Sequence, residues 1–368
     1  MSTARGGQGG GGGLRVVVTG ASGNVGTSVV KALLASSRPV SVVGVARRLP
    51  DRQQDGTDWV SVDIGRPDAE RELTRVLEGA DAVIHLAWLL QPSHDPAVTW
   101  RTNVLGTDRV LRAAAAAEVP AVVCASSVAA YSPRPADRDR FWVDESWPTH
   151  GWPTAAYSRE KAYVERLLDV FERDQPAVRV VRMRPSFIFK RGSAMEQRRH
   201  FAGPLLPNRL VRPSLVPVVP DVPGLRFQAV HSDDVGRACA SAVTGEARGA
   251  FNLAADTLLD GPELGRLLDA RPVPVPRLPV RQALAAAWRL RLVPAPPTLF
   301  DALMRLPLLE TGRARSELGW EPTLSGPEAV AELLRGMREG AGMDTPPLTA
   351  RLRGGRLREL ATGVGGRA

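Results

Sequence analysis

One stretch near the beginning of the chain limits the possible folds more than any other. An apolar run at Val16–Val18 leads into three glycines, Gly20, Gly23 and Gly26, with the spacing G-x-x-G-x-x-G, and apolar residues at helical spacing follow. This order predicts a strand, a tight turn and the start of a helix. A pyrophosphate needs backbone N–H groups at close range and the positive end of a helix dipole, so side chains at Gly20 and Gly23 would block it. We therefore expect a dinucleotide site here, with Gly26 letting the helix pack close to the strand.

The rest of the first half repeats the pattern of strand followed by helix. Apolar strands are predicted at residues 14–19, 40–45, 59–62, 82–87 and 121–126, with helices at 26–35, 70–77, 98–117 and from 157 onward. A late strand is predicted at 250–253 and a helix at 280–292. The alternation indicates an α/β fold with a doubly wound parallel sheet, whose ligands bind beyond the carboxyl ends of the strands.

A tyrosine and a lysine stand four residues apart where the helix from 157 begins, so Tyr157 and Lys161 share one helix face. The chain has three tyrosines and three lysines in 368 residues, and chance rarely produces this spacing. A free tyrosine has a pKa of about 10. We expect a nearby ammonium and a positively charged nicotinamide to favour the phenolate, which makes Tyr157 a candidate acid/base for hydride transfer. Ser127, at a strand end, can hold the substrate oxygen.

The ends of the second and third predicted strands bear on the choice of dinucleotide. An acidic residue after the second strand would bond the ribose hydroxyls of NAD, but Arg47 and Arg48 stand there instead. Guanidinium groups suit a 2′-phosphate, so we expect NADP over NAD, although both arginines could simply be solvated. Asp63 could accept a hydrogen bond from the adenine amine, with Ile64 beside the ring. The alternative for Asp63 is an ordinary turn aspartate.

Composition excludes several other classes of function. The net charge is +9, but three of the 48 basic residues are lysine and the arginines are scattered, so we expect no nucleic-acid partner. No apolar run approaches the roughly 20 residues of a membrane span, so no membrane association is expected. Cys124 and Cys239 lie far apart in apolar contexts. They predict neither a metal site nor a disulfide framework, and a cytoplasmic location follows as the expectation.

The ordered set of motifs resembles the extended short-chain dehydrogenase/reductases, specifically the NAD-dependent epimerase/dehydratase family. The resemblance covers about residues 14–340. The matching segments are Thr19–Gly26, Asp63-Ile64, His85-Leu86-Ala87, Asn103–Thr107, Ser126–Tyr131, Tyr157–Lys161, Arg184-Pro185, His231–Val235 and Gly319–Pro322.

The resemblance implies a role for each of these residues. Ser127, Tyr157 and Lys161 would be the catalytic serine, the acid/base and the ribose-binding lysine, with Asn103 in a central helix that supports the active site. His85, inside an apolar run, is expected to be a packed strand residue. The expected cofactor-binding residues are Gly20, Ser22, Gly23, Asn24, Val25, Gly26, Arg47, Arg48, Asp63, Ile64, Leu86, Ala87, Tyr157, Lys161, Arg184 and Pro185.

Departures from the family pattern bear on the reaction. Val128-Ala129 replace the Asp-Glu of the sugar-nucleotide dehydratases, which argues against that elimination. Phe227 stands where family members commonly have an arginine near the nucleotide phosphates, and Phe189–Gly192 replaces the usual Gly-Pro. We expect an NAD(P)-dependent oxidoreductase acting on a secondary alcohol or ketone, with a lipid-like compound or a small carbonyl or alcohol as the substrate. A nucleotide-sugar epimerase with retained NAD and a non-catalytic NAD(P)-sensing protein are the alternatives.

The predicted organisation has four parts. A disordered Gly-rich leader (1–13) precedes a dinucleotide-binding domain (14–185), and a disordered tail follows at 346–368. A smaller substrate-binding region (186–345) is interleaved with the last elements of the dinucleotide-binding domain at about 229–256. Trp288, Leu292 and Phe300 could line an apolar pocket there or belong to the core. Family resemblance also implies a homodimer, formed by the helices at 98–117 and 157–171.

Overall fold

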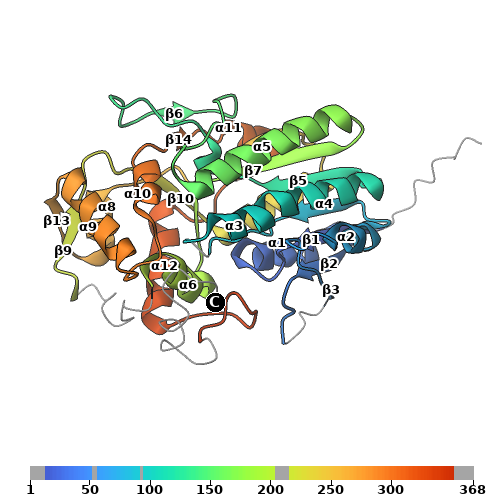
Figure 1. Cartoon of the computed structure of the whole chain (residues 1–368), viewed down its shortest axis with the longest axis horizontal. Helices are drawn as coiled ribbons and strands as arrows, with labels where there is room; N and C mark the ends of the chain where they lie inside the picture. The colour runs from blue at the N-terminus through green and yellow to red at the C-terminus, as the bar shows by residue number, and fades with distance from the viewer. Residues whose placement is uncertain (1–12, 52–55, 92–93, 204–214, 352–368) are drawn as a thin grey trace, which may run out of the picture.

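A seven-stranded parallel sheet forms the centre of the protein (Figure 1). The structure, a computed structural model, describes residues 13–51, 56–91, 94–203 and 215–351, so nearly all of the predicted leader lies outside the described residues. The sheet order is β11-β7-β5-β4-β1-β2-β3. The strands are β1 (Leu14–Thr19), β2 (Val40–Ala46), β3 (Thr57–Ser61), β4 (Ala82–His85), β5 (Ala121–Ala125), β7 (Arg179–Pro185) and β11 (Gly249–Leu253). This confirms the predicted doubly wound α/β fold.

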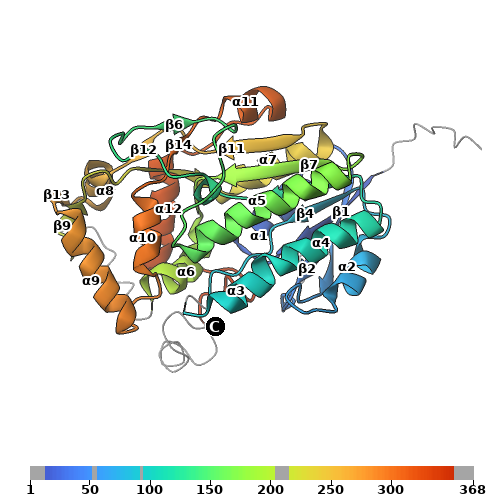
Figure 2. The same ribbon diagram turned by 45° about the horizontal axis from the view of Figure 1, so that its top comes forward.

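Helices bury both faces of this sheet, which explains why its strands are continuous apolar runs. Along β1, Val16 and Val18 face one layer of core and Val17 faces the other. The first layer includes α1 (Asn24–Leu34), α7 (Ser232–Thr244) and α11 (Gly312–Leu318). The second includes α2 (Ala69–Leu77), α4 (Leu105–Ala116) and α5 (Ala156–Asp174), with α3 (Pro96–Asn103) continuing the line of α4 (Figure 2).

The strand order reverses beside β1, and this reversal places the candidate site. From β1 the chain proceeds to β2 and β3 on one side, and β4, β5, β7 and β11 then fill the other side. Because all seven strands are parallel, their carboxyl ends lie along one edge. The connections after β1 and β4 separate at that edge, which is where open α/β sheets bind ligands.

The single helix predicted at 98–117 is two helices, α3 and α4, which meet at Val104. The Thr107 hydroxyl donates to the Asn103 carbonyl at 2.5 Å. A side-chain hydroxyl that bonds a helical carbonyl in this way commonly bends a helix. Gly106 lets the bend lie against Ile64, since a Cβ at Gly106 would come within 3.0 Å of that side chain.

A smaller lobe stands beside the carboxyl edge of the sheet (Figure 1). Its short strands are β8 (Phe187–Phe189), β9 (Val218–Asp221), β10 (Phe227–His231), β12 (Leu258–Leu259) and β13 (Arg271–Pro274), and β6 (Trp142–Val143) pairs with β14 (Leu308–Leu309). Its helices are α6 (Ala194–Gln197), α8 (Gly261–Leu268), α9 (Arg277–Arg289), α10 (Pro297–Leu303) and α12 (Gly326–Glu339). Three short helical segments complete the described elements: η1 (Val128–Ala130), η2 (Arg191–Ser193) and η3 (Arg198–Ala202).

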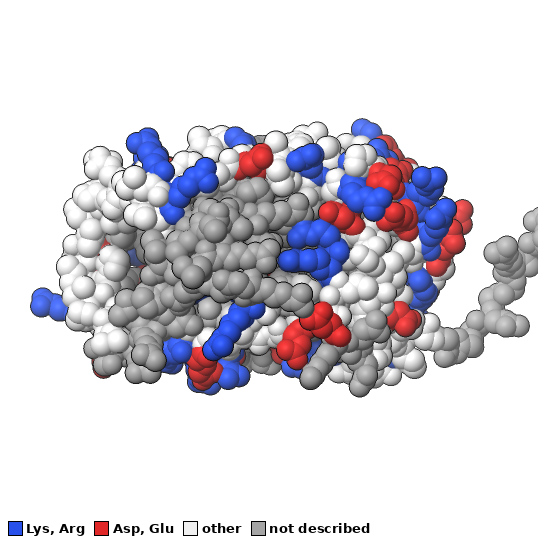
Figure 3. All heavy atoms as spheres, turned by 60° about the horizontal axis from the view of Figure 1, so that its bottom comes forward, with Lys and Arg blue, Asp and Glu red and all other residues white. Residues whose placement is uncertain are grey.

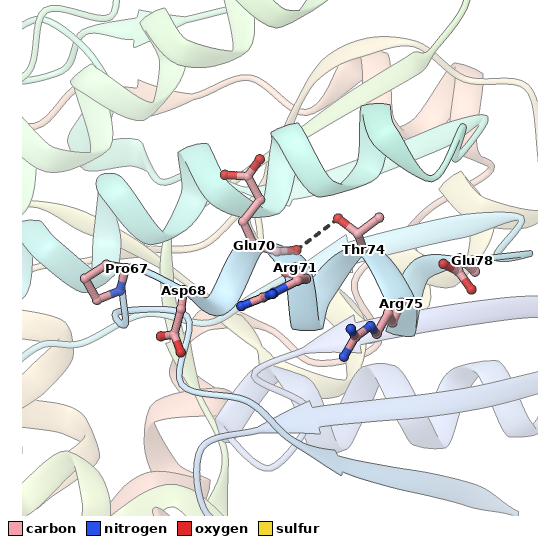
Figure 4. Close-up of a pocket in the computed structure, with 7 residues that line it drawn as sticks. All are labelled: Pro67, Asp68, Glu70, Arg71, Thr74, Arg75 and Glu78. Atoms are coloured by element: carbon pink, nitrogen blue, oxygen red, sulfur yellow. Dashed lines mark hydrogen bonds between the residues drawn. The ribbon is translucent and has the colours of Figure 1, made fainter.

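On the side drawn in Figure 3, the basic and acidic side chains of the described residues are intermixed. A shallow hollow runs along α2, where Arg71, Arg75 and Glu78 line it and the Thr74 hydroxyl donates to the Glu70 carbonyl at 2.9 Å (Figure 4). None of the predicted site residues lines this hollow. Within the described ranges, every helix is too short or too polar to cross a bilayer.

Candidate active site

The glycine-rich turn joins β1 to α1 at the carboxyl edge of the sheet. Gly20 has a φ of +75°, and a Cβ there would lie 2.7 Å from the Ala87 nitrogen, so the turn and the residues after β4 are in direct contact. A Cβ on Gly26 would lie 2.1 Å from the Gly20 carbonyl oxygen. Gly26 therefore permits the close approach of helix and turn that the sequence predicts. At Gly20 the structure shows two reasons for glycine other than ligand access, a left-handed backbone and contact with Ala87.

The amino end of α1 is suited to an anion. Gly23 is its N-cap and contributes no side chain, and the first turn of the helix carries no acidic residue. The amides and the positive end of the dipole are therefore not neutralised by the helix's own side chains. Ser22 is buried, while Gly23, Asn24 and Val25 are half-buried. A glycine cradle of this kind fits a dinucleotide pyrophosphate.

Tyr157 and Ser127 meet at the carboxyl end of β5. Tyr157 lies in the first turn of α5, and Ser127 lies just after β5, where its Oγ accepts a hydrogen bond from the Ala129 amide at 3.1 Å. Burial raises the pKa of Tyr157, and its hydrogen bond with Ser127 lowers the pKa by less, so the pKa lies above its ordinary value. This is opposite to the expected stabilisation of a phenolate. The surrounding protein groups therefore favour the phenol over the phenolate.

Lys161 faces Trp88 and the end of β5 rather than the Tyr157 ring. Its Nζ donates to the Ala125 carbonyl at 2.8 Å and lies 3.4 Å from the centroid of the Trp88 indole, compared with 6.0 Å from the Tyr157 centroid. The indole is also edge-on to Tyr157, with 5.9 Å between ring centroids. Burial lowers the pKa of Lys161 to about 8. The ammonium therefore remains mostly charged at neutral pH, stabilised by the indole face.

Asn103 fastens the residues after β4 to α5. Its Oδ1 accepts from the Leu89 amide at 2.7 Å, and its Nδ2 donates to the Leu89 carbonyl at 2.8 Å and to Glu160 at 2.7 Å. Thr99 also donates to Glu160, at 2.6 Å. The Asn103 side chain thus holds the segment that carries Trp88. Within the described residues, it makes no hydrogen bond with Ser127, Tyr157 or Lys161.

His85 is a packed strand residue, as its apolar context predicts. It is buried in β4 between two hydroxyls, with Thr19 Oγ1 at 2.7 Å from Nδ1 and Thr107 Oγ1 at 2.9 Å from Nε2. Burial, together with the nearby charge of Lys161, lowers the pKa of His85 to about 3. A neutral imidazole therefore links β1, β4 and α4.

Arg184 belongs to a buried network and does not face the glycine turn. Its guanidinium donates twice to Glu165, at 2.9 Å each, and also to the Tyr131 hydroxyl and the Glu145 carbonyl. Every nitrogen of the Arg184 guanidinium is thus engaged by protein, and its contact with the cofactor stays a prediction. Pro185 ends β7 and is buried beside β11.

The other predicted cofactor residues divide into two groups. Leu86 continues from β4, its amide bonded to the Thr19 carbonyl at 3.0 Å, and Arg47 and Arg48 follow β2, half-buried and exposed respectively. These lie at the carboxyl edge of the sheet. Asp63 instead accepts from the Gly65 amide at 3.0 Å, and Ile64 is 4% exposed in the core. This bond forms an ordinary aspartate turn and uses one carboxylate oxygen of Asp63, so the contact of Asp63 and Ile64 with an adenine stays a prediction.

Two residues at the site had no role in the sequence interpretation. Trp88 contacts Lys161 and Tyr157. The sequence feature that could have identified Trp88 as a site residue is its position directly after the His85-Leu86-Ala87 motif. Lys190 extends from the end of β8 to α1, where its Nζ donates to Asn24 O, Thr27 Oγ1 and Ser28 Oγ at 2.7–3.2 Å. Burial lowers the pKa of Lys190 to about 8.

The residues proposed for an apolar pocket separate in the structure. Trp288 stacks on His94, with ring centroids 4.3 Å apart, whereas Leu292 is exposed and Phe300 is half-buried. Trp288 is half-buried, so these three residues do not belong to the buried core. Among the described residues, no group of three or more His, Cys, Asp or Glu side chains could hold a metal ion.

Comparison with known proteins identifies the family. The sequence profile of the NAD dependent epimerase/dehydratase family matches residues 16–254. The chain is 32% identical over 176 residues to a 4-hydroxy-2-methyl-3-oxo-4-farnesyl-3,4-dihydroquinoline-1-oxide ketoreductase of Stigmatella aurantiaca, covering 48% of this chain and 51% of the relative. It is 39% identical over 115 residues to an L-arabinose 1-dehydrogenase (NAD(P)(+)) of Haloferax volcanii, covering 31% and 41%. The chain thus spans about half the length of these curated relatives, or less.

Solved structures show the same fold at low identity. UDP-glucose 4-epimerase of Thermotoga maritima, solved with UDP-glucose, is similar with a TM-score of 0.66 and 19% identity, covering 89% of this chain and 99% of that one. The UDP-glucose 4-epimerase of Thermus thermophilus, in complex with NAD, has a TM-score of 0.62 and 19% identity, covering 88% and 99%. With the family profile spanning most of the chain and the fold agreeing, this protein belongs to the NAD-dependent epimerase/dehydratase family.

Proposed function

We propose that the protein is an NAD(P)-dependent oxidoreductase that transfers a hydride at a secondary alcohol or ketone, with Tyr157 as the acid/base. The observation that carries this proposal is the convergence of three side chains at one strand end. Ser127, Tyr157 and Lys161 come from the end of β5 and one face of α5, beside the residues that touch the glycine turn. A bound nicotinamide dinucleotide would supply or accept the hydride.

The protonated phenol of Tyr157 is the form that reduction of a carbonyl requires. Because the pKa of Tyr157 is raised, its phenol keeps its proton at neutral pH and can donate it to a carbonyl oxygen. Ser127 would hold that oxygen, since its own Oγ is oriented by the Ala129 amide. Lys161, still charged, would bind ribose hydroxyls. Asn103 acts as a positioning residue that keeps Trp88 against this group.

The cofactor is proposed to be NADP in preference to NAD. The glycine cradle and the uncapped end of α1 fit the pyrophosphate of either dinucleotide. The difference comes from Arg47 and Arg48, which follow β2 at the carboxyl edge of the sheet with no acidic residue beside them in sequence before Asp51. A guanidinium there would pair with a 2′-phosphate.

An apolar carbonyl compound is the proposed substrate class. The Phe227 ring packs edge-on against Phe187, with centroids 5.2 Å apart, at the position where a phosphate-binding arginine is common in the family. The farnesylated substrate in the name of the Stigmatella ketoreductase is of the same chemical class. A sensing protein without chemistry would not need the catalytic side chains, so we rank it last.

A nucleotide-sugar epimerase with retained NAD is the second candidate. The observation that favours it is a covered glycine turn, where the Thr345 hydroxyl donates to the Ser22 carbonyl at 2.8 Å. An epimerase oxidises and re-reduces the same substrate and therefore gains from keeping its dinucleotide bound. The two candidates differ in substrate and in cofactor exchange, so one set of measurements separates them.

The first test compares Tyr157→Phe with the wild type. Purified protein is assayed with NADPH and aliphatic or steroid-like ketones, and in parallel with UDP-sugars. We expect turnover of the ketones, and Tyr157→Phe should lower kcat about 10²- to 10⁴-fold because proton transfer to the oxygen is lost. Dinucleotide binding, measured by NADPH fluorescence, should stay within about twofold because the ribose and phosphate contacts remain.

Tyr163→Phe is the matched control, since Tyr163 lies on the same helix but is 47% exposed. It should keep wild-type activity. Full turnover by Tyr157→Phe would contradict the mechanism. Turnover of UDP-sugars alone would replace the oxidoreductase with the epimerase.

We also infer a homodimer formed through α5 and through α4 with the end of α3 that carries Trp100. These helices lie side by side on one face of the sheet (Figure 2). Leu105 on α4 is 40% exposed and Val170 on α5 is 46% exposed, and the half-buried Trp100 ring packs on Tyr163 at 4.9 Å. Two such faces would bury each other's apolar side chains as a four-helix bundle.

A further inference from the structure

Residues 341–350, called the strap here, leave the end of α12 and cross to the glycine-rich turn. The strap is a closed loop of its own. The Met343 amide donates to the Leu348 carbonyl at 2.9 Å, and the Leu348 amide donates to the Thr345 carbonyl at 3.0 Å. A Cβ on Gly342 would lie 2.3 Å from the Ala350 nitrogen, so the two ends of the loop are in contact. Leu348 is completely buried. Residues 346–350, expected to start a disordered tail, are therefore partly or fully buried, Arg351 is exposed, and 352–368 lie outside the described residues.

On one side the strap contacts the turn and helix that would hold the pyrophosphate. The Thr345 hydroxyl donates to the Ser22 carbonyl at 2.8 Å, within the G-x-x-G-x-x-G motif itself. The Thr27 hydroxyl, in the first turns of α1, lies 3.9 Å from the Met343 sulfur. Both contacts join segments more than 300 residues apart in sequence.

On the other side the strap contacts the segment that follows β8. Arg199 donates to the Pro347 carbonyl at 2.9 Å and to the Thr349 carbonyl at 3.0 Å. A Cβ on Gly192 would lie 2.9 Å from the Met343 side chain, so Gly192 makes room for it. Lys190 in the same segment is bonded to α1. The strap thus connects the glycine-rich turn and α1 with the segment that follows β8.

We propose that the strap is part of the dinucleotide site, where it fixes the glycine-rich turn and slows the release of a bound dinucleotide. This inference rests on the proposed function only in requiring that the turn binds a dinucleotide. The physical argument is positional. A dinucleotide bound at the glycine-rich turn would lie next to the strap, which Thr345 and Arg199 hold in place. To leave, the dinucleotide has to break these contacts of the strap or pass around them. For a reductase, which exchanges its dinucleotide in every turnover, opening of the strap then limits the rate.

The test measures release of NADPH from three variants. Wild type, Thr345→Val and Thr349→Val are loaded with NADPH, and dissociation is followed by stopped-flow fluorescence after mixing with excess NADP. Thr345→Val removes the hydroxyl that bonds Ser22 and keeps the side-chain shape, and we expect release to be about fivefold faster because one hydrogen bond is lost. Thr349→Val is the matched control, because the Thr349 hydroxyl bonds Arg351 within the same segment. Its release rate should equal that of wild type.

Hydrogen exchange gives a second readout that does not depend on a variant. Binding of NADPH should slow exchange of the strap amides of wild-type protein. Equal release rates for Thr345→Val and Thr349→Val would overturn the inference, as would faster exchange of the strap on binding, which would mean that NADPH displaces it. A wild-type chain that binds neither NADPH nor NADH overturns both this inference and the proposed function. If the dinucleotide binds and Tyr157→Phe is fully active, the proposed function is overturned and the inference about the strap is not.

Discussion

Trp88 determines what Lys161 contacts. The lysine shares a helix face with Tyr157, but the indole lies closer to its ammonium than the phenol ring does. The ammonium of Lys161 therefore lies against an aromatic face and a strand-end carbonyl. Tyr157 is half-buried, its ring centroid lies 6.0 Å from that charge, and its pKa is raised. The surrounding protein groups therefore favour the protonated phenol.

At the same scale, Arg47 and Arg48 lead to a prediction about dinucleotide preference. Replacing both with serine should weaken NADPH binding about 10- to 100-fold, because a charge-assisted contact with the 2′-phosphate is lost. NADH binding should change by less than about twofold, since it has no such phosphate. Isothermal titration with each dinucleotide measures both effects.

Arg38→Ser is the control for that comparison, because Arg38 is an exposed arginine at the opposite end of β2. It should alter neither affinity. Equal losses of NADPH and NADH affinity in the double variant would show that the two arginines do not read the 2′-phosphate.

Among the elements, α5 contributes most to the site. Tyr157, Lys161 and Glu165 recur every four residues, so one face carries the two candidate catalytic groups and a buried carboxylate. Glu165 accepts from Ser126, Arg182 and Arg184 at 2.5–3.1 Å. Burial raises the pKa of Glu165, but the hydrogen bonds and charges of these partners outweigh it and the pKa is lowered. The carboxylate thereby fastens α5 to β5 and β7.

Glu165→Gln should lower the free energy of unfolding by about 3–5 kcal/mol, because it removes one partner of a buried ion network. Chemical denaturation at pH 7 measures this. A lowered carboxyl pKa stabilises the fold above its unfolded value and loses that effect as pH falls through the folded value. The gap between wild type and Glu165→Gln should therefore shrink below about pH 4.5.

Asp169→Asn provides the comparison for that experiment. Asp169 lies one turn further along α5 and also pairs with Arg182, but its side chain is largely solvated. Its loss should cost less than about 1 kcal/mol. A similar cost for both variants would mean that burial does not set the strength of this network.

For the whole molecule, the face formed by α4 and α5 leads to a prediction about assembly. The wild type should sediment as a dimer, and Tyr163→Glu should sediment as a monomer, because it places a charge in the apolar contact. Analytical ultracentrifugation measures both. Leu290→Glu, at the exposed end of α9, is the control and should remain dimeric. A wild-type monomer at every concentration tested would contradict the proposed dimer.

The fold could be predicted from local patterns because both faces of the sheet are buried. Continuous valine runs and the glycine spacing are visible without tertiary contacts, and they lead directly to β1, the turn and α1. The break between α3 and α4 could not be predicted in this way. It depends on the Thr107 hydroxyl and on Ile64, a residue from another segment that packs against Gly106.

The sequence alone determined which residue types stand at the strand ends and on the first turns of α1 and α5, because spacing along a strand or helix is a local property. Only the tertiary structure decided what each of them contacts. In the folded protein Arg184 bonds Glu165 and Ile64 is buried. Trp88 lies over Lys161, and Thr345 bonds Ser22. The physical reason is that pKa values, hydrogen-bond partners and burial depend on neighbours from distant segments, which no local pattern specifies.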